Sequence, residues 1–216
     1  MDIKRTTSLG SGSIGIINYG MGNLKSIQNA LEYLGIANFL IEKPNDFSKC
    51  SKLILPGVGS FNQAIKNLND LKFIDGIKES VLIKEKPILG ICLGMQIMAE
   101  IGEEDGISSG LSLIPGIVSK FNFELINLKI PHIGFNKAYF VDNNSTLFKG
   151  LGDSSDFYFV HSYKLSETKT EVISSYCEYG EKFVSSISYK NIHGTQFHPE
   201  KSQNNGLIVL KNFVSI

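Results

Sequence analysis

Features that define several common protein classes are scarce in this chain of 216 residues. It has no tryptophan and only three cysteines, Cys50, Cys92 and Cys177, which are odd in number and widely spaced. That arrangement argues against a disulfide framework and against a CxxC metal site. We therefore expect no metal and no other cofactor, and a protein of the reducing cytoplasm.

Long apolar runs and an excess of either charge are missing as well. Runs such as Ile14 to Ile17 and Val81 to Ile83 fall far short of the about 20 residues that a membrane-spanning helix needs. Lys and Arg number 21, as do Asp and Glu, so net charge gives no indication of nucleic acid or an anionic membrane surface as partner. We expect a soluble protein whose specificity lies in a defined site.

The chain is predicted to form a single domain. Residues 1–13 lack an apolar signal core, and Leu9-Gly10-Ser11-Gly12-Ser13 is typical of a flexible tag or linker. The remaining length, 14–216, is common for one α/β domain with a large core.

A strand, glycine turn and helix recur through the first half. Ile14 to Asn18 is an apolar run that ends at Gly20-Met21-Gly22, and apolar residues then repeat with helical spacing from Leu24 to Leu34. The unit returns at Lys52 to Leu55 with its following helical stretch, and at Pro87 to Ile91, followed by Cys92 and a predicted helix from Leu93 to Ile101. Alternating strands and helices imply a parallel sheet with right-handed crossovers.

The second half is predicted to consist mostly of strands. β-branched and aromatic runs separated by turn residues occur at Ile117 to Phe123, Lys137 to Val141, Phe157 to Leu165, Glu171 to Tyr176, Phe183 to Tyr189 and Ile192 to Gln196. A closing helix is predicted at Gly206 to Val214. The fold class is therefore α/β: an open, mostly parallel sheet flanked by helices, with additional antiparallel strands and ligand-binding loops at the carboxyl ends of its parallel strands.

Cys92 occupies the setting of a catalytic nucleophile. Gly90-Ile91-Cys92-Leu93-Gly94 joins a buried strand to a helix, which is the layout of a nucleophile elbow with Cys in place of Ser. The flanking glycines permit the tight turn, and the positive end of the helix favours the thiolate. A lone cysteine is more often a buried structural residue, and that description suits Cys50 and Cys177.

His198-Pro199-Glu200 supplies the other two groups that a thiolate mechanism needs. Residues two apart in an extended chain share a face, so Glu200 can orient the imidazole of His198 and stabilise its protonated form. Alone, such a triplet is usually a surface turn. Together with the Cys92 elbow it favours a catalytic triad of nucleophile, base and orienting acid.

Two glycine loops follow other predicted strands. Pro56-Gly57-Val58-Gly59 could let backbone N–H groups approach the oxygen of a tetrahedral intermediate, although most loops of this kind are plain turns. Gly20-Met21-Gly22 is a poor dinucleotide fingerprint, because Lys25 stands where the third glycine would be. A nicotinamide cofactor is therefore rejected.

These motifs together resemble the class I glutamine amidotransferases, which have a flavodoxin-like fold, and within them the glutaminase subunits of imidazole glycerol phosphate synthases. Besides the Cys92 and His198 motifs, the resemblance rests on Asn18-Tyr19-Gly20-Met21-Gly22-Asn23, Leu55-Pro56-Gly57-Val58-Gly59, Pro131-His132-Ile133-Gly134-Phe135-Asn136 and Phe157-Tyr158-Phe159-Val160-His161-Ser162-Tyr163. It runs from Ile14 nearly to the end of the chain.

The resemblance implies a role for each matching residue. Cys92 attacks the side-chain amide of glutamine, the amides of Val58 and Gly59 hold the oxyanion, and His198 protonates the departing ammonia before activating water against the thioester. Substrate contacts are implied for Gly57, Gln96, Glu104, His161, Ser162 and Tyr163. Glu104 could also be a solvated loop residue, and His161 or Tyr163 could be ordinary strand residues.

The resemblance also implies a partner, a (β/α)₈-barrel cyclase subunit that forms a heterodimer with the chain, receives its ammonia and closes an imidazole ring in histidine biosynthesis. Asn23, Phe135, Tyr158 and Lys201 match positions that face such a barrel, although Asn23, Tyr158 and Lys201 could equally be plain surface or strand residues. The family usually has Trp where this chain has Phe135, which keeps an apolar anchor but loses area and an N–H donor.

Two alternatives remain open from the sequence. The same glutaminase chemistry could serve another synthase, such as one that amidates surface-sugar precursors. A subunit that keeps the fold without the chemistry would be a binding protein, but intact Cys92, His198 and Glu200 count against it.

Overall fold

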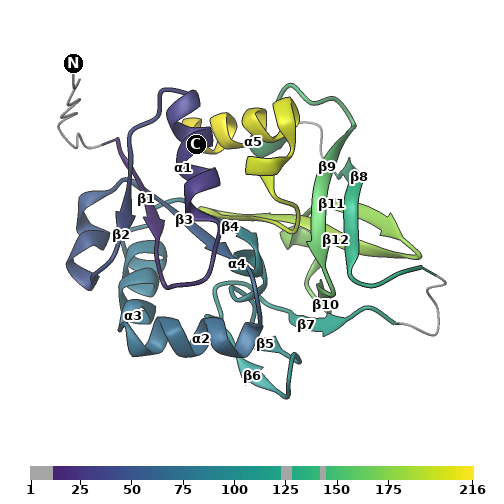
Figure 1. Cartoon of the computed structure of the whole chain (residues 1–216), viewed down its shortest axis with the longest axis horizontal. Coiled ribbons are helices and arrows are strands. Elements are labelled where there is room, and N and C mark those ends of the chain that lie inside the picture. Colours follow the sequence, from purple (N-terminus) through teal and green to yellow (C-terminus); the bar gives the residue numbers. More distant parts are fainter. Residues whose placement is uncertain (1–11, 123–127, 142–144) are drawn as a thin grey trace.

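The computed structural model describes residues 12–122, 128–141 and 145–216 (Figure 1). Residues 1–11 of the expected linker lie outside the described residues, as does Phe123 at the end of a predicted strand. Ser13 is buried, and its carbonyl accepts a hydrogen bond of 3.1 Å from the Ser51 N–H.

The first part of a nine-stranded sheet is parallel, as the recurring strand and helix pattern predicts. Its strands lie in the order β2-β1-β3-β4-β13, and each pairs in parallel with its neighbours. They span Asn38–Ile41 (β2), Ile14–Ile17 (β1), Lys52–Gly57 (β3), Ile88–Cys92 (β4) and Ile192–Thr195 (β13). The strands β3, β4 and β13 are buried on both faces, which explains the nearly continuous apolar sequences of β3 and β4.

The same sheet continues beyond β13 with antiparallel strands in the order β12-β11-β8-β9. These span Glu181–Tyr189 (β12), Ile173–Tyr179 (β11), His132–Phe140 (β8) and Ser154–His161 (β9). A smaller sheet has the order β10-β7-β5-β6. Its strands span Tyr163–Ser166 (β10), Ile117–Lys120 (β7), Ile101–Gly102 (β5) and Ser108–Ser109 (β6).

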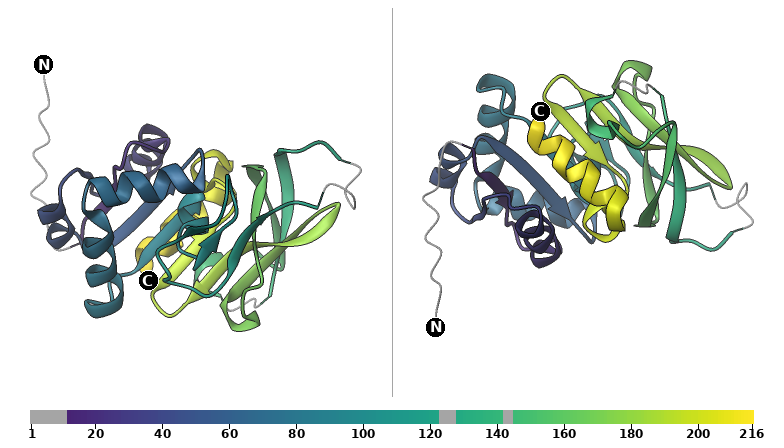
Figure 2. Two further views of the ribbon diagram at one scale, coloured as in Figure 1. Left: turned by 90° about the horizontal axis from the view of Figure 1, so that it is seen from below. Right: turned by 90° about the horizontal axis from the view of Figure 1, so that it is seen from above.

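Helices cover both faces of the parallel part (Figures 1 and 2). On one face lie α1 (Leu24–Tyr33) and α5 (Gln203–Ser215), which bury Ile27, Leu31 and Phe213. On the other lie α2 (Phe61–Asp70), α3 (Phe73–Lys78) and a π-helical turn (Glu79–Ile83). Short 3₁₀ turns occur at Pro44–Lys49, Thr146–Phe148, Thr170–Val172 and Pro199–Lys201. Within the described ranges, no helix is long and apolar enough to cross a membrane.

The predicted helix from Leu93 to Ile101 is wrong in length, because α4 spans only Leu93–Gln96. The next carbonyls accept hydrogen bonds from another part of the chain: that of Ile97 from Leu111 N–H at 2.8 Å, and that of Met98 from Leu113 N–H at 2.8 Å. These bonds replace the i to i+4 bonds of a helix. A fully buried apolar run does not reveal from its periodicity that it leaves the helix.

The predicted continuous strand from Phe157 to Leu165 is also wrong. It divides at Ser162 into β9, which belongs to the large sheet, and β10, which belongs to the small one. Other predicted strands differ at their ends: β8 begins earlier than Lys137, and β11 begins after a 3₁₀ turn that contains Glu171. The sequence analysis missed β2, a four-residue strand with three half-buried residues.

Candidate active site

Three neighbouring parallel strands deliver the predicted chemical groups to one edge of the sheet. The order β3-β4-β13 places the loop after Gly57, the elbow at Cys92 and the turn that holds His198 side by side. In open α/β sheets this carboxyl-terminal edge is the usual place for ligand binding.

The elbow at Cys92 has the strained backbone that its motif predicts. Cys92 ends β4, precedes α4 and has φ 55° and ψ −114°, a conformation that non-glycine residues rarely adopt. A Cβ atom at Gly94 would overlap the Leu55 carbonyl oxygen, so only glycine lets α4 approach β3 this closely. The turn therefore fixes the position of the thiol through the backbone.

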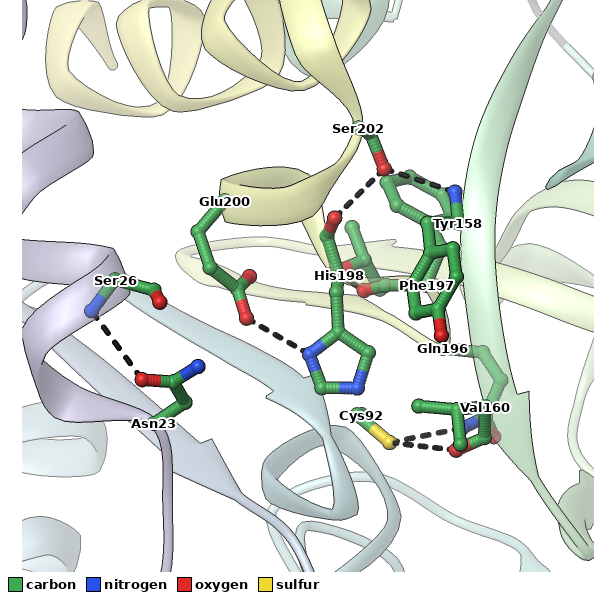
Figure 3. A network of polar contacts seen from close by, with 11 residues as sticks. Asn23, Ser26, Cys92, Tyr158, Val160, Gln196, Phe197, His198, Glu200 and Ser202 are labelled. Carbon is green, nitrogen blue, oxygen red and sulfur yellow. Dashed lines mark hydrogen bonds and ion pairs between the residues drawn. The ribbon is translucent and has the colours of Figure 1, made fainter. Parts of the chain in front are cut away.

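The sulfur of Cys92 contacts two polar groups from distant segments (Figure 3). Its Sγ atom is 3.8 Å from the Val160 carbonyl oxygen and 3.7 Å from Nε2 of Gln196. Cys92 is 6% exposed, and it lines the cleft through which a substrate would reach its sulfur.

His198 and Glu200 are adjacent, as the triplet predicts. His198 Nδ1 lies 2.8 Å from Glu200 Oε1, and both side chains are almost fully buried. Because Pro199 begins a 3₁₀ turn, the two side chains meet across that turn instead of along an extended strand. The Ser202 hydroxyl holds the turn to β9: it donates to the His198 carbonyl at 2.6 Å and accepts from the Tyr158 N–H at 2.9 Å.

The charge of His198 is stabilised by its neighbours. Burial of the ring opposes its charge, but the Cys92 sulfur and the Glu200 carboxylate outweigh it and raise the pKa of His198 to about 10. Its Nε2 faces Cys92 (Figure 3), so hydrogen bonding and charge attraction to the sulfur both favour the protonated ring. The arrangement places a charged imidazole between the cysteine sulfur and an orienting carboxylate.

A cleft of about 270 Å³ opens above the sulfur. Apart from Cys92, the predicted residues that line it are Val58, Gly59, Gln96, Glu104, His161, Ser162 and Tyr163. Gly57 is not among them, because it lies within β3 beneath Tyr19 and α4. Leu93, Pro131 and Val160 also line the cleft and were not singled out from the sequence. Leu93 could have been, since the residue after an elbow nucleophile commonly donates its N–H to an oxyanion.

Glu104 is tied into the cleft wall, so the solvated-loop alternative does not describe it. Its Oε2 accepts a hydrogen bond of 2.7 Å from the Phe61 N–H at the start of α2. Burial raises the pKa of Glu104, and that N–H bond partly counteracts the rise. The carboxylate thus forms an acidic point on the rim of the cleft.

The corner between β9 and β10 brings His161 and Tyr163 to the cleft. His161 Nδ1 donates to the Tyr163 carbonyl at 2.8 Å, and Gln96 Nε2 donates to the same oxygen at 2.8 Å. His161 Nε2 is 3.0 Å from Nδ1 of His132, and burial lowers the pKa of His161 to about 3. His161 is therefore a neutral, hydrogen-bonded wall residue.

The Pro56 to Gly59 segment is fixed at its start and open at its end. The Tyr19 hydroxyl donates to the Pro56 carbonyl at 2.8 Å, and burial together with the Cys92 charge raises the pKa of Tyr19, so this donor stays protonated. Val58 is 42% exposed, and Gly59 has a φ of 110°. The exposed Val58–Gly59 end is therefore the part of the segment with the most room to rearrange.

Three of the four residues expected at a partner interface form one cluster. Phe135 is 52% exposed and contacts the ring of Tyr158 edge-on, with centroids 5.7 Å apart, while Lys201 Nζ is 5.7 Å from the Tyr158 ring centre. Asn23 lies on the opposite side of Glu200 (Figure 3), where its side chain caps α1 by accepting from Ser26 N–H.

Among the described residues, no group of three or more His, Cys, Asp or Glu side chains could hold a metal ion.

The sequence profile of the family described as "Glutamine amidotransferase class-I" matches residues 15–216. The chain belongs to this family. Among its relatives is an imidazole glycerol phosphate synthase subunit HisH 1 from Campylobacter jejuni (strain RM1221), 50% identical over 203 residues that cover 94% of this chain and all of that protein. The HisH subunit of Leptospira interrogans is 40% identical over 205 residues, with the same coverage of both chains.

A third relative is longer. The chloroplastic imidazole glycerol phosphate synthase hisHF of Arabidopsis thaliana is 40% identical over 212 residues, which are 97% of this chain and 35% of that protein. Among solved structures, PurLQS from Thermotoga maritima has a TM-score of 0.75 at 15% identity. The superposed part covers 95% of this chain and 99% of the matched PurLQS chain. At that identity the likeness concerns the fold, and it confirms the predicted fold class.

Proposed function

We propose that this amidotransferase is the glutaminase subunit of an imidazole glycerol phosphate synthase, which hydrolyses glutamine and passes ammonia to a cyclase partner in histidine biosynthesis. The observation that carries the proposal is the buried His198–Glu200 pair facing the sulfur of Cys92 at the floor of an open cleft. The HisH relatives, 40% to 50% identical along nearly the whole chain, support the particular synthase.

The first half-reaction forms a thioester. The Cys92 sulfur attacks the carboxamide carbon of glutamine, and the negative charge moves to the carboxamide oxygen, toward the N–H groups of Val58 and Gly59. Leu93 follows the nucleophile at the start of α4 and lines the cleft, so its N–H is a further candidate donor to this oxygen. The C–N bond then breaks as His198, charged beforehand by its pairing with Glu200, gives its proton to the leaving nitrogen.

The second half-reaction releases glutamate. His198 is now neutral and accepts a proton from water, the water oxygen attacks the thioester carbon, and the C–S bond breaks to return the thiolate. Glu200 holds Nδ1 of the ring throughout and stabilises the imidazolium each time it forms.

The cleft walls distinguish the two ends of glutamine. Glu104 offers a carboxylate to the α-ammonium group, and Ser162 and Tyr163 offer the polar corner of β9 and β10 to the α-carboxylate. The Nε2 group of Gln96 already donates to the Tyr163 carbonyl and to Gln196 Oε1, so Gln96 forms part of the cleft floor. These placements put the carboxamide end of the substrate over Cys92.

The partner in this proposal docks on the face that Phe135, Tyr158 and Lys201 form. Ile133 and Tyr139, on the same face of β8, are also more than half exposed. The Arabidopsis relative supports a synthase partner, because a chain of this kind corresponds there to about a third of a longer synthase protein. An exposed apolar strand face beside the cleft suits a heterodimer that captures ammonia.

The decisive test mixes the chain with the histidine-pathway barrel, its ribonucleotide-derived substrate and glutamine. The proposal expects glutamate and the imidazole product in equal amounts. Glutamate formation without imidazole product would leave the glutaminase standing and assign it to another synthase. Absence of glutamate in every combination would identify a binding subunit.

We expect the isolated chain to be a poor glutaminase, at least tenfold slower than the complex with substrate-loaded partner, or about 1.4 kcal/mol of coupling. The reason is the freedom of the Val58–Gly59 peptide beside a pinned Pro56, which leaves the oxyanion donors unaligned until the partner selects one arrangement. Steady-state glutamate release with and without the barrel measures the ratio. Equal rates would exclude gating by the partner.

Phe135→Ala should weaken association with the histidine-pathway barrel by about 2 kcal/mol or more, as expected for a central aromatic anchor. Phe135→Trp should bind as well as wild type, whereas a partner with a narrower pocket would be overpacked by Trp. Titration calorimetry measures both. Tyr33→Ala is the matched control, since Tyr33 is 79% exposed but lies on α1, away from β8 (Figure 1). Unchanged affinity in Phe135→Ala would remove this residue from the interface.

A further inference from the structure

Gln196 is a buried polar residue that the triad does not use. It follows β13 and precedes His198 by two residues, its side chain is fully buried, and its backbone N–H donates to the Ser185 carbonyl at 2.9 Å. A buried side-chain amide needs partners for its oxygen and its nitrogen, because leaving either unpaired costs free energy. One of the hydrogen-bond partners of the Gln196 side chain is the nucleophile, Cys92.

A backbone carbonyl determines which way the amide of Gln196 points. The Tyr163 carbonyl oxygen can only accept, so Gln96 must direct its NH₂ group toward it, at 2.8 Å. That same nitrogen lies 2.9 Å from the Gln196 side chain, which must therefore present its oxygen, Oε1. The Gln196 NH₂ group is then left facing the Cys92 sulfur, at 3.7 Å.

The Tyr163 carbonyl, which orients Gln96 and through it Gln196, has a second donor. His161 Nδ1 donates to the same Tyr163 carbonyl at 2.8 Å, which leaves Nε2 of His161 to accept from Nδ1 of His132 at 3.0 Å. His132 Nε2 then accepts from Asn136 Nδ2 at 3.4 Å. In this arrangement every N–H donor from Asn136 to Gln196 faces an acceptor. Exchanging the oxygen and nitrogen of the Gln196 amide would place two N–H groups against each other, so only one orientation of the amide satisfies its partners.

The sulfur therefore contacts both an acceptor and a donor. The Val160 carbonyl oxygen, 3.8 Å away, favours the thiol, which can donate to it, and repels a thiolate. The amide of Gln196 donates to the sulfur and favours the thiolate, and hydrogen bonds to charged groups are stronger than neutral ones. With the amide in this orientation, Gln196 adds to the stabilisation of the thiolate that the charged His198 provides.

We propose that Gln196 is a positioning residue for the nucleophile, whose side-chain amide holds the Cys92 sulfur as a thiolate against the Val160 carbonyl. Gln96 keeps that amide in the donating orientation. The inference rests on the proposed function, because it assumes that the thiolate of Cys92 is the reacting group. Gln196 does not line the cleft, so its effect reaches glutamine only through the sulfur.

The test measures the rate of Cys92 alkylation by iodoacetamide against pH in the full chain, with mass spectrometry to identify the site. In Gln196→Met, which keeps the volume and removes the amide, the pH midpoint should rise by about one unit, so alkylation at pH values below the wild-type midpoint should be about tenfold slower. In Gln196→Glu the carboxylate can still accept from Gln96 but turns a negative oxygen to the sulfur, so the midpoint should rise further. In both variants kcat for glutamine should fall while KM stays near the wild-type value.

The control is Thr195→Val, which removes a buried hydrogen bond to the Phe197 carbonyl from the same segment without touching the sulfur. It should leave the alkylation profile unchanged even if the protein is less stable. Wild-type alkylation profiles in both Gln196 variants would overturn the inference; if Gln196→Met does not fold, Gln196→Glu alone decides. Wild-type protein in which Cys92 reacts no faster than Cys50 and Cys177 would instead contradict the proposed function.

Discussion

Cys92→Ala is expected to abolish glutamine-dependent turnover completely, while the complex with the barrel partner still makes product from added ammonium. Removing Sγ removes the atom that forms the thioester, and no described cysteine could replace it: Cys50 and Cys177 are buried elsewhere in the two cores. The partner's ring closure needs ammonia from any source, so only the supply is lost. Glutamate release and product formation are measured with each nitrogen donor.

Cys177→Ala is the matched control, since it removes a fully buried thiol away from the cleft. Burial raises the pKa of Cys177 to about 12 and also raises that of Cys50, so neither forms a thiolate at neutral pH. This variant should lose stability and keep its glutaminase activity. A glutamine-like electrophile should label Cys92 and spare the other two thiols. Residual glutaminase activity in purified Cys92→Ala would refute the assignment of the nucleophile.

The protein is also expected to lose stability steeply as pH falls from 6.5 to about 4. Three of its four histidines are buried in neutral form, and burial lowers the pKa of His132 to about 4, of His161 to about 3 and of His193 to about 4. The unfolded chain binds protons at these residues below about pH 6.5, whereas the folded chain does not, so the native state is disfavoured as pH falls through this window. His198 is protonated in both states there and adds no slope.

The expected magnitude is large. Each histidine contributes a slope of about 1.4 kcal/mol per pH unit once the unfolded residue is protonated, so the three together reach about 4 kcal/mol per unit. Over two units this approaches the whole unfolding free energy of an ordinary domain, about 5–15 kcal/mol. Urea denaturation at a series of pH values between 7 and 4.5 gives the slope and hence the number of protons taken up.

His193→Asn tests the origin of that slope. His193 lies outside the active site, where its Nδ1 is 2.9 Å from the Ser188 hydroxyl and its ring packs near Phe213. The variant is expected to be less stable at every pH, and its slope should decrease by about one proton because asparagine does not titrate. A flat wild-type profile between pH 6.5 and 5 would show that these rings are already protonated in the native state.

The local sequence determined the chemical core of the site. One pattern is a glycine-flanked Cys92 between a buried strand and a helix, and the other is an acid two residues after His198. Each pattern spans only a few residues, and over so short a stretch backbone geometry allows few conformations. The alternation of apolar strands and amphipathic helices likewise determined the parallel part of the sheet, since each pattern has its own period.

Tertiary structure alone decided where the helix after Cys92 ends and where the strand before Tyr163 bends. Ile97 and Met98 are as apolar as helix residues, but their carbonyls pair with residues 111 and 113. Ser162 carries no turn signal of its own, yet the chain leaves one sheet for another there and so brings His161 and Tyr163 to the cleft. The contact between Gln196 and Cys92 joins residues 104 positions apart. Contacts between residues so far apart depend on how the sheets pack. The presence of a glutamine in the sequence does not indicate which buried atom its side-chain amide will contact.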